Sequence, residues 1–225
     1  MGYYPIFIEL EGKKILVVGG GNVAQRKIET FLEFGASVDI VSRKLTAKLK
    51  ELVEEGRVRH IGREYDEEYL KDASLIIIAT NDKQLNHRIS KSVREKGMLT
   101  NTVDQPSDCN FIVPSIVRKG ELLIAISTSG KSPALAKKIR KEIESQFGSE
   151  YDSLLYLMGI IRKEVLKRGL PQESNKRIFN EIINSDILDA LVRNDQERIE
   201  DILRDIIPWE ISLDECLKKR SLGND

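Results

Sequence analysis

The sequence predicts an α/β protein: a doubly wound parallel sheet first, then a hairpin with one helix, then a tail of helices only. Three observations favour this order. Short apolar runs alternate with amphipathic stretches over residues 14–103, which implies right-handed crossovers between parallel strands. Two apolar runs then flank a short glycine turn at residues 118–120, as in a hairpin. From residue 150 onward only helical periodicity is found.

The first part is expected to contain five strands and three helices. Ile15–Val18 is a short unbroken apolar run, which is typical of a strand covered on both faces. The other four strands are expected at Ser37–Val41, Val58–Ile61, Leu75–Ala79 and Leu99–Val103. Helices are expected at Asn22–Phe34, Leu45–Glu55 and Asp82–Lys96, each followed by a glycine that can end it. Residues 4–12 alternate in polarity and predict a short edge strand.

The rest of the chain changes character after a turn-rich loop at residues 104–110. Phe111–Val117 and Glu121–Ser127 are expected to pair as a hairpin, and Pro133 suits the first turn of a helix that runs to about Phe147. The tail predicts helices at Tyr151–Arg168, Gln172–Asn184, Ile187–Arg193 and Gln196–Ile206. We therefore expect three domains, at residues 1–113, 114–149 and 150–225.

Composition narrows the class of protein. The chain has 225 residues, is 40% hydrophobic and 32% charged, and carries a net charge of zero. This balance gives no reason to expect nucleic-acid or membrane binding, and no apolar run approaches the ~20 residues that span a bilayer. Two distant cysteines and no recognisable signal peptide predict a reducing, cytoplasmic location.

A glycine motif directly after the first strand predicts a nucleotide site. Gly19, Gly21 and Ala24 have the G-x-G-x-x-A spacing of the dinucleotide fingerprint. Gly19 permits the tight turn, Gly21 lets backbone N–H groups approach a pyrophosphate, and Ala24 lets the helix pack closely on the strand. The following helix N-terminus favours phosphate. The pattern predicts an NAD(P)-binding Rossmann domain; the alternative is an ordinary glycine-rich turn between a strand and a helix.

A second candidate feature is a basic segment at residues 114–141. The segment contains seven basic residues and one acidic residue, so its net charge is seven minus one, or +6. The segment is either a solvated surface or a binding wall for an acidic ligand.

Five short stretches together resemble the precorrin-2 dehydrogenase family, which includes the N-terminal module of sirohaem synthase. Their order and spacing cover residues 5 to about 145. They are Val17-Val-Gly-Gly-Gly-Asn-Val-Ala-Gln-Arg-Lys27, Ile78-Ala-Thr-Asn-Asp82, Asn101-Thr-Val-Asp104, Cys109-Asn-Phe-Ile-Val-Pro-Ser115 and Ile126-Ser-Thr-Ser-Gly-Lys-Ser-Pro133.

The resemblance implies an enzyme that oxidises precorrin-2 to sirohydrochlorin with NAD⁺ on the route to sirohaem. It implies a homodimer built on a central dimerisation segment, and in some members insertion of Fe²⁺ into the product. By matching positions, Asp104 is the catalytic residue. The cofactor-binding positions, including the two motif glycines, are Gly19, Gly21, Asn22, Val23, Arg43, Lys44, Thr80 and Asn81.

The chemistry of the residues agrees in outline with this resemblance. Asp104 follows a strand, where a carboxylate could act as a base beside a nicotinamide, although Asp-Gln-Pro-Ser is also ordinary turn chemistry. The basic segment suits a polycarboxylate substrate. Its candidate substrate-binding residues are Thr128, Ser129, Lys131, Ser132 and Arg140.

One departure concerns the cofactor. NAD sites usually carry an acidic residue at the end of the second strand, whereas this chain has Arg43, which could accommodate the 2′-phosphate of NADP. Asp39 is expected to lie too early in the strand to replace it. The resemblance favours NAD.

No resident metal site is expected. His60 and His87 are isolated and have no zinc-ligand spacing, and Cys109 is expected to be a packed thiol. Two other functions stay open: a ferrochelatase, and a sensor that binds NAD(H) without catalysis.

Overall fold

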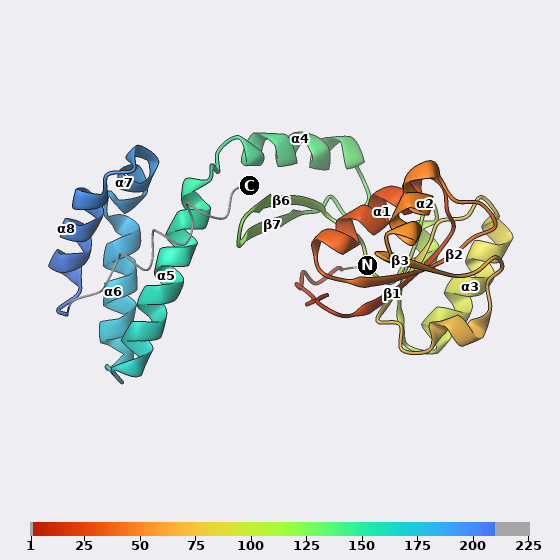
Figure 1. The fold of residues 1–225 in the computed structure, drawn as a ribbon, viewed down its shortest axis with the longest axis horizontal. Helices are drawn as coiled ribbons and strands as arrows, with labels where there is room; N and C mark the ends of the chain where they lie inside the picture. Colours follow the sequence, from red (N-terminus) through yellow and green to blue (C-terminus); the bar gives the residue numbers. More distant parts are fainter. Residues whose placement is uncertain (1, 210–225) are drawn as a thin grey trace. The chain divides into compact units, whose positions relative to one another are not determined.

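The computed structural model describes residues 2–209. The chain divides into two compact units, Met1–Val113 and Pro114–Asp225 (Figure 1). Each unit is described by itself below.

Unit 1 is built on a five-stranded, all-parallel sheet with the order β3-β2-β1-β4-β5. The strands are β1 (Lys14–Val18), β2 (Ser37–Val41), β3 (Val58–Gly62), β4 (Leu75–Ile78) and β5 (Leu99–Thr102). The chain moves outward from β1 to β3 and then returns to the other side of β1. The sheet is therefore doubly wound, as predicted, and its strand order reverses between β1 and β4. That reversal is where such sheets bind ligands.

Helices cover both faces of this sheet (Figure 1). They are α1 (Asn22–Glu33), α2 (Ala47–Glu54) and α3 (Lys83–Glu95). Ile15 and Val17 of β1 share a core with α1 and α2, whereas Leu16 and Val18 share a core with α3. The alternation of side chains along a strand explains why β1 is apolar at every one of these positions.

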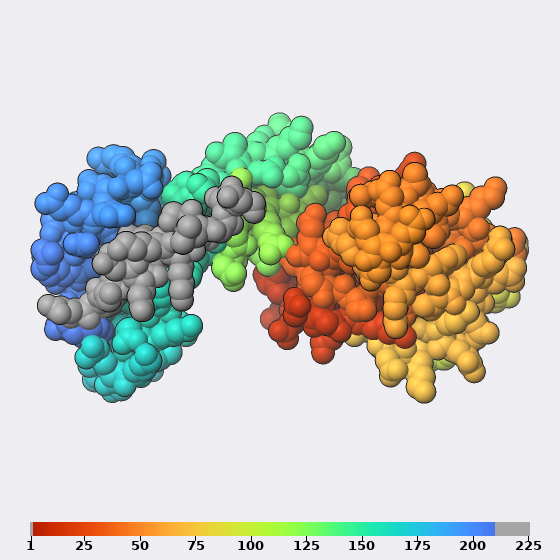
Figure 2. Space-filling model, viewed as in Figure 1, coloured from red at the N-terminus to blue at the C-terminus, as the bar shows by residue number. Residues whose placement is uncertain are grey.

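The predicted edge strand at residues 4–12 is wrong. Among the described residues the edge strands of the sheet are β3 and β5, and residues 2–13 belong to no strand. Tyr4, Ile6 and Phe7 are 86%, 65% and 72% exposed. Alternation therefore failed as a signal because most of these apolar side chains are exposed; Leu10 packs against the core of unit 1. This segment, red in Figure 2, lies on the surface of unit 1.

Unit 2 begins with the predicted hairpin, but its first strand starts later than expected. Strand β6 (Ser115–Lys119) pairs antiparallel with β7 (Leu122–Ile126), and α4 (Pro133–Glu144) packs on both. Phe111, expected in the first strand, packs instead against the core of unit 1. Helix α4 ends at Glu144, three residues before the expected end.

Four further helices share an apolar core in unit 2. They are α5 (Glu150–Lys167), α6 (Gln172–Asn184), α7 (Ile187–Arg193) and α8 (Gln196–Ile206), close to the predicted bounds. Residues 210–225 of the predicted tail, Cys216 included, lie outside the described residues. Two short 3-10 helices, η1 (Glu67–Leu70) and η2 (Pro106–Asp108), were not predicted. Within residues 2–209, no helix has both the length and the apolar character needed to cross a bilayer.

Candidate functional site

The glycine loop after β1 is enclosed on two sides. Gly19 has a φ of +121°, and a Cβ there would strike the carbonyl oxygen of Ala79 just beyond β4. A Cβ on Gly20 would strike the carbonyl oxygen of Lys44 in the loop after β2. Sequence reasoning assigned the tight turn to Gly19 but gave Gly20 no role. Both positions need glycine because neighbouring backbone occupies the space of a side chain.

Gly21 has the opposite environment. A Cβ on Gly21 would have no heavy atom within 4 Å apart from its chain neighbours. Helix α1 starts immediately after it, with no side-chain cap and no acidic residue in its first turn. The first N–H groups of a helix have no intrahelical partner and carry partial positive charge. Gly21, Asn22 and Val23, all exposed, therefore present an open donor surface that fits a pyrophosphate.

The ends of β4 and β5 lie beside each other. Their register pairs Ile78 with Thr102, and the N–H of Val103 continues the ladder by donating to the carbonyl of Ile78 over 2.9 Å. This continuation brings Thr80 and Asp104 to the same end of adjacent strands. We call the set Gly19, Gly20, Gly21, Asn22, Val23, Thr80, Asn81 and Asp104 the carboxyl edge, because all of them lie at the carboxyl ends of β1, β4 and β5.

Asp104 has an unusual backbone conformation at this edge. Its φ is +57°, in the left-handed region, and its side chain is exposed. Aspartate tolerates this region better than most residues, but non-glycine residues are uncommon there and such positions cluster at functional sites. The structure thus presents a carboxylate to solvent at the end of β5, where it could accept a proton from a bound molecule.

Behind the carboxyl edge, Thr80 is joined to three side chains that sequence reasoning missed. Asn86 of α3 bonds to Thr80, Gln105 bonds to Asn86, and Asp108 bonds to Gln105. We call Thr80, Asn86, Gln105 and Asp108 the amide network. Its members come from three separate segments, so no local spacing in the sequence announces it. Only the turn-rich character of residues 104–110 pointed toward this region.

Cys109, just after η2, and Lys27 of α1 both bond to residues of β5. The thiol of Cys109 accepts a hydrogen bond from the N–H of Thr102 over 3.1 Å, and burial raises the pKa of this thiol. It is a packed thiol, as predicted, because it is partly buried and its sulfur bonds to both the N–H and the carbonyl of Thr102. Lys27 Nζ donates to Asn101 Oδ1 over 3.1 Å, and burial lowers the pKa of Lys27.

The two basic residues after β2 lie in an exposed loop. Arg43 Nη2 is 2.7 Å from Glu64 Oε1, and the loop is held by Ser42 Oγ, which donates to the carbonyl of Lys44 over 2.7 Å. Asp39 is buried in β2, where Arg59 binds both of its carboxylate oxygens. This pairing engages the only acid of β2.

The two histidines are far apart in the fold of unit 1. His60 Nε2 lies 2.9 Å from the carbonyl oxygen of Ser42, and His87 Nδ1 lies 2.9 Å from Asp108 Oδ1. In the described part of the chain, no group of three or more histidine, cysteine, aspartate or glutamate side chains could hold a metal ion.

The predicted substrate-binding residues of unit 2 lie in the loop between β7 and α4 and on α4 itself. Ser132 Oγ caps α4 by accepting from the N–H of Leu135, and Thr128 Oγ1 donates to the carbonyl of Ser132. Ser129 and Lys131 are exposed, and Arg140 Nη1 is paired with Glu144 Oε2 at 2.6 Å. The loop is therefore fixed by its own hydrogen bonds, with Ser129 and Lys131 at its surface.

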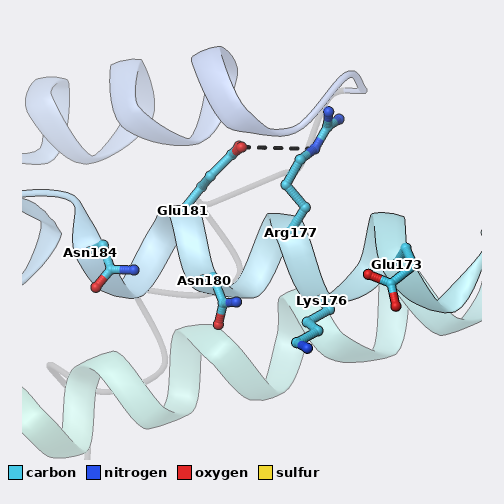
Figure 3. Close-up of a pocket in the computed structure, with 6 residues that line it drawn as sticks. All are labelled: Glu173, Lys176, Arg177, Asn180, Glu181 and Asn184. Atoms are coloured by element: carbon cyan, nitrogen blue, oxygen red, sulfur yellow. Dashed lines mark ion pairs between the residues drawn. The ribbon is translucent and has the colours of Figure 1, made fainter.

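A separate hollow of about 380 Å³ lies on α6 (Figure 3). Its lining residues are exposed and come from one helix: Glu173, Lys176, Arg177, Asn180, Glu181 and Asn184. The ion pair between Arg177 and Glu181, 3.7 Å apart, is an ordinary pair four residues apart on one helix. No predicted site residue lines this hollow, so the carboxyl edge remains the candidate site.

Comparisons with known proteins show the family of the chain. Residues 6–115 match a family model described as NAD(P)-binding, and residues 119–146 match the model of the sirohaem biosynthesis protein central domain. The solved structure of SirC, a precorrin-2 dehydrogenase, is 30% identical, with a TM-score of 0.71 over 92% of this chain and 100% of that chain. The chain belongs to the precorrin-2 dehydrogenase family. Its Rossmann domain is an NAD(P)-binding domain.

Longer proteins contain a region similar to most of this chain. The siroheme synthase of Photorhabdus laumondii is 35% identical over 82% of this chain and 39% of its own length. That of Methylobacillus flagellatus is 36% identical over 86% of this chain and 41% of its own length. The chain thus spans about two fifths of the length of these curated relatives.

Proposed function

We propose that this chain oxidises precorrin-2 to sirohydrochlorin with NAD⁺, on the route to sirohaem. The observation that carries the proposal is the presence of the open glycine loop and of Asp104 at the same carboxyl edge. The similarity to SirC, whose name states the same dehydrogenase activity, supports it.

The reaction removes two hydrogens from the tetrapyrrole, one with its electron pair and one as a proton. NAD⁺, when bound, accepts the hydride. The N–H groups at the start of α1 hold the pyrophosphate, and Gly21 leaves room for it. Asp104 takes the proton, because its carboxylate is exposed at the end of β5 and a positioned base lowers the barrier of such a step. The products are sirohydrochlorin, NADH and one proton.

Substrate binding is assigned to the basic segment of unit 2. Lys131 and Ser129 are exposed in the loop before α4 and can bind substrate carboxylates directly. Thr128 and Ser132 hold the loop in shape. Arg140 can reach a carboxylate only by sharing its guanidinium with Glu144. The observation that favours this assignment is the excess of basic residues within the segment.

The cofactor is proposed to be NAD rather than NADP. Arg43, the residue that could bind a 2′-phosphate, is already paired with Glu64. A second negative group beside Glu64 would be repelled by its carboxylate.

We also propose a homodimer formed through residues 114–149, with residues 150–225 as a separate helical domain. Each strand of the β6–β7 sheet has one strand neighbour among the described residues, and four apolar side chains of β7 are only partly buried: Leu122, Leu123, Ile124 and Ile126. Helix α4 packs on this sheet, and a second copy could cover the side chains that α4 leaves partly exposed. A cytoplasmic location fits the free thiol of Cys109.

The experiment is anaerobic absorbance spectroscopy of the protein with precorrin-2, with NAD⁺ and NADP⁺ supplied separately. Sirohydrochlorin formed with NAD⁺ supports the proposal, and Fe²⁺ added afterwards tests the bifunctional alternative against a protein-free control. A folded protein that binds NADH but oxidises no precorrin-2 would instead be the NAD(H) sensor.

A further inference from the structure

Asn86 ties α3 to the end of β4. Its side chain is buried, and its Nδ2 donates to the backbone carbonyl of Thr80 over 3.0 Å. Its Oδ1 accepts from the hydroxyl of Thr80 over 2.5 Å. The amide of Asn86 therefore bonds to the hydroxyl and to the backbone carbonyl of Thr80 at the carboxyl edge.

Gln105, the residue after Asp104, continues the amide network. Its Oε1 accepts from Asn86 Nδ2 over 3.2 Å, and its Nε2 donates to Asp108 Oδ2 over 3.0 Å. The amide of Gln105 thus has a fixed polarity, with its acceptor facing Asn86 and its donor facing Asp108. Reversing that polarity would place donor against donor at Asn86 and acceptor against acceptor at Asp108.

Asp108 anchors the other end of the network. Its carboxylate is buried, and each oxygen has a partner: Gln105 Nε2 on Oδ2, and His87 Nδ1 on Oδ1 at 2.9 Å. Its backbone carbonyl also accepts from Ser90 Oγ. A buried carboxylate is tolerated only where such donors are supplied, so the network favours one arrangement over alternatives.

Hydrogen bonds hold the chain on both sides of Asp104. The ladder bond of Val103 fixes the chain before it, and the side chain of Gln105 fixes the chain after it. Between them Asp104 adopts φ +57°, a conformation that an aspartate keeps only where its surroundings impose it. We propose that Gln105 and Asp108 are positioning residues that hold Asp104 in its working conformation. This inference rests on the proposed dehydrogenase function.

The test breaks one hydrogen bond and then re-forms it with the opposite polarity. Gln105→Glu replaces the donor that faces Asp108 with a carboxylate oxygen, and two carboxylates at this distance repel. Adding Asp108→Asn supplies an N–H donor to the new carboxylate. The side-chain oxygen of this asparagine remains available to His87. Gln105→Met, similar in length but without a hydrogen bond, is a second disrupting variant. Gln196→Glu, exposed at the start of α8, is the matched control for the chemical change.

Three quantities are measured: kcat and KM for precorrin-2 at saturating NAD⁺, the Kd of NADH, and deuterium exchange in peptides covering residues 103–109. Gln105→Glu and Gln105→Met are expected to lower kcat about tenfold or more, since small misplacement of a catalytic group costs that much. Exchange should become faster, and the Kd of NADH should stay within about twofold because the glycine loop is untouched. The double variant should recover most of the lost kcat and of the protection.

Several outcomes would overturn the inference. Unchanged kcat in Gln105→Glu and Gln105→Met would remove the positioning role, and so would a loss that the double variant does not recover. Unchanged exchange would show that the network does not hold the segment. A wild-type protein that oxidises no precorrin-2 would defeat the proposed function, and the positioning role with it. An active wild type beside equally active variants would defeat the inference alone.

Discussion

Arg43 Nη2 lies 2.7 Å from Glu64 Oε1, although the two side chains are 74% and 73% exposed. The pair lies after β2, where an NAD site usually has an acid for the ribose hydroxyls. Under the proposal that the cofactor is NAD, we expect Glu64, which lies 21 residues further along the chain, to keep Arg43 from a 2′-phosphate.

Replacing Glu64 should improve NADP⁺ binding. Exposed ion pairs contribute about 0.2–1 kcal/mol, so Glu64→Gln should lower the Kd of NADP⁺ by up to about fivefold. The Kd of NAD⁺ should not change. Titration calorimetry with each nucleotide measures both values. Glu51→Gln, which breaks the exposed pair with Lys48 on α2, is the control. An unaltered Kd for NADP⁺ would remove Glu64 from cofactor selection.

Substitution of Gly21 should weaken cofactor binding without impairing folding. Gly21→Asp places a carboxylate in open space beside the start of α1, so the protein should fold normally while the Kd of NADH rises about a hundredfold or more through charge repulsion. Gly21→Ala is the matched control and should bind more tightly than the aspartate variant. NADH fluorescence and thermal unfolding separate the two effects. Normal NADH affinity in Gly21→Asp would refute the pyrophosphate site.

Asp39 is expected to serve stability rather than catalysis. Its buried carboxylate accepts hydrogen bonds from Nε and Nη2 of Arg59 and lies 3.5 Å from Lys14 Nζ. Asp39→Ala should lower the free energy of unfolding by about 2 kcal/mol, since the charge-assisted hydrogen bonds between the buried carboxylate and Arg59, whose side chain is 62% exposed, are lost. Urea unfolding followed by circular dichroism measures this. Glu67→Ala, which breaks an exposed pair with Lys96, should change it by less than about 1 kcal/mol. A similar small change in Asp39→Ala would contradict the assignment.

Local patterns in the sequence were sufficient for most of the fold. The apolar runs around Ile15 and Ile77 are buried on both faces of the sheet and predicted its parallel, doubly wound form. Residues 4–12 misled because alternation reports a strand only when one face meets a core, and Tyr4 and Phe7 meet none.

The site was predictable only where a motif carries its own chemistry. The spacing of Gly19 and Gly21 predicted a nucleotide-binding loop. Asp104 was predicted from a family resemblance. The side chains of the amide network could not be found in this way. Asn86 and Gln105 are joined by tertiary contact across 19 positions, and the amide side chains of both are common on helices and in turns.

The most direct test of the account is single-turnover oxidation of precorrin-2 by the wild type and by Asp104→Asn, both saturated with NAD⁺ under anaerobic conditions. The asparagine keeps the shape and the left-handed backbone but cannot accept the proton, and the exposed position should leave folding intact. The account predicts a rate about 10²- to 10⁴-fold lower than that of the wild type, with the Kd of NADH unchanged. Equal rates would contradict it, because Asp104 would then take no part in the oxidation.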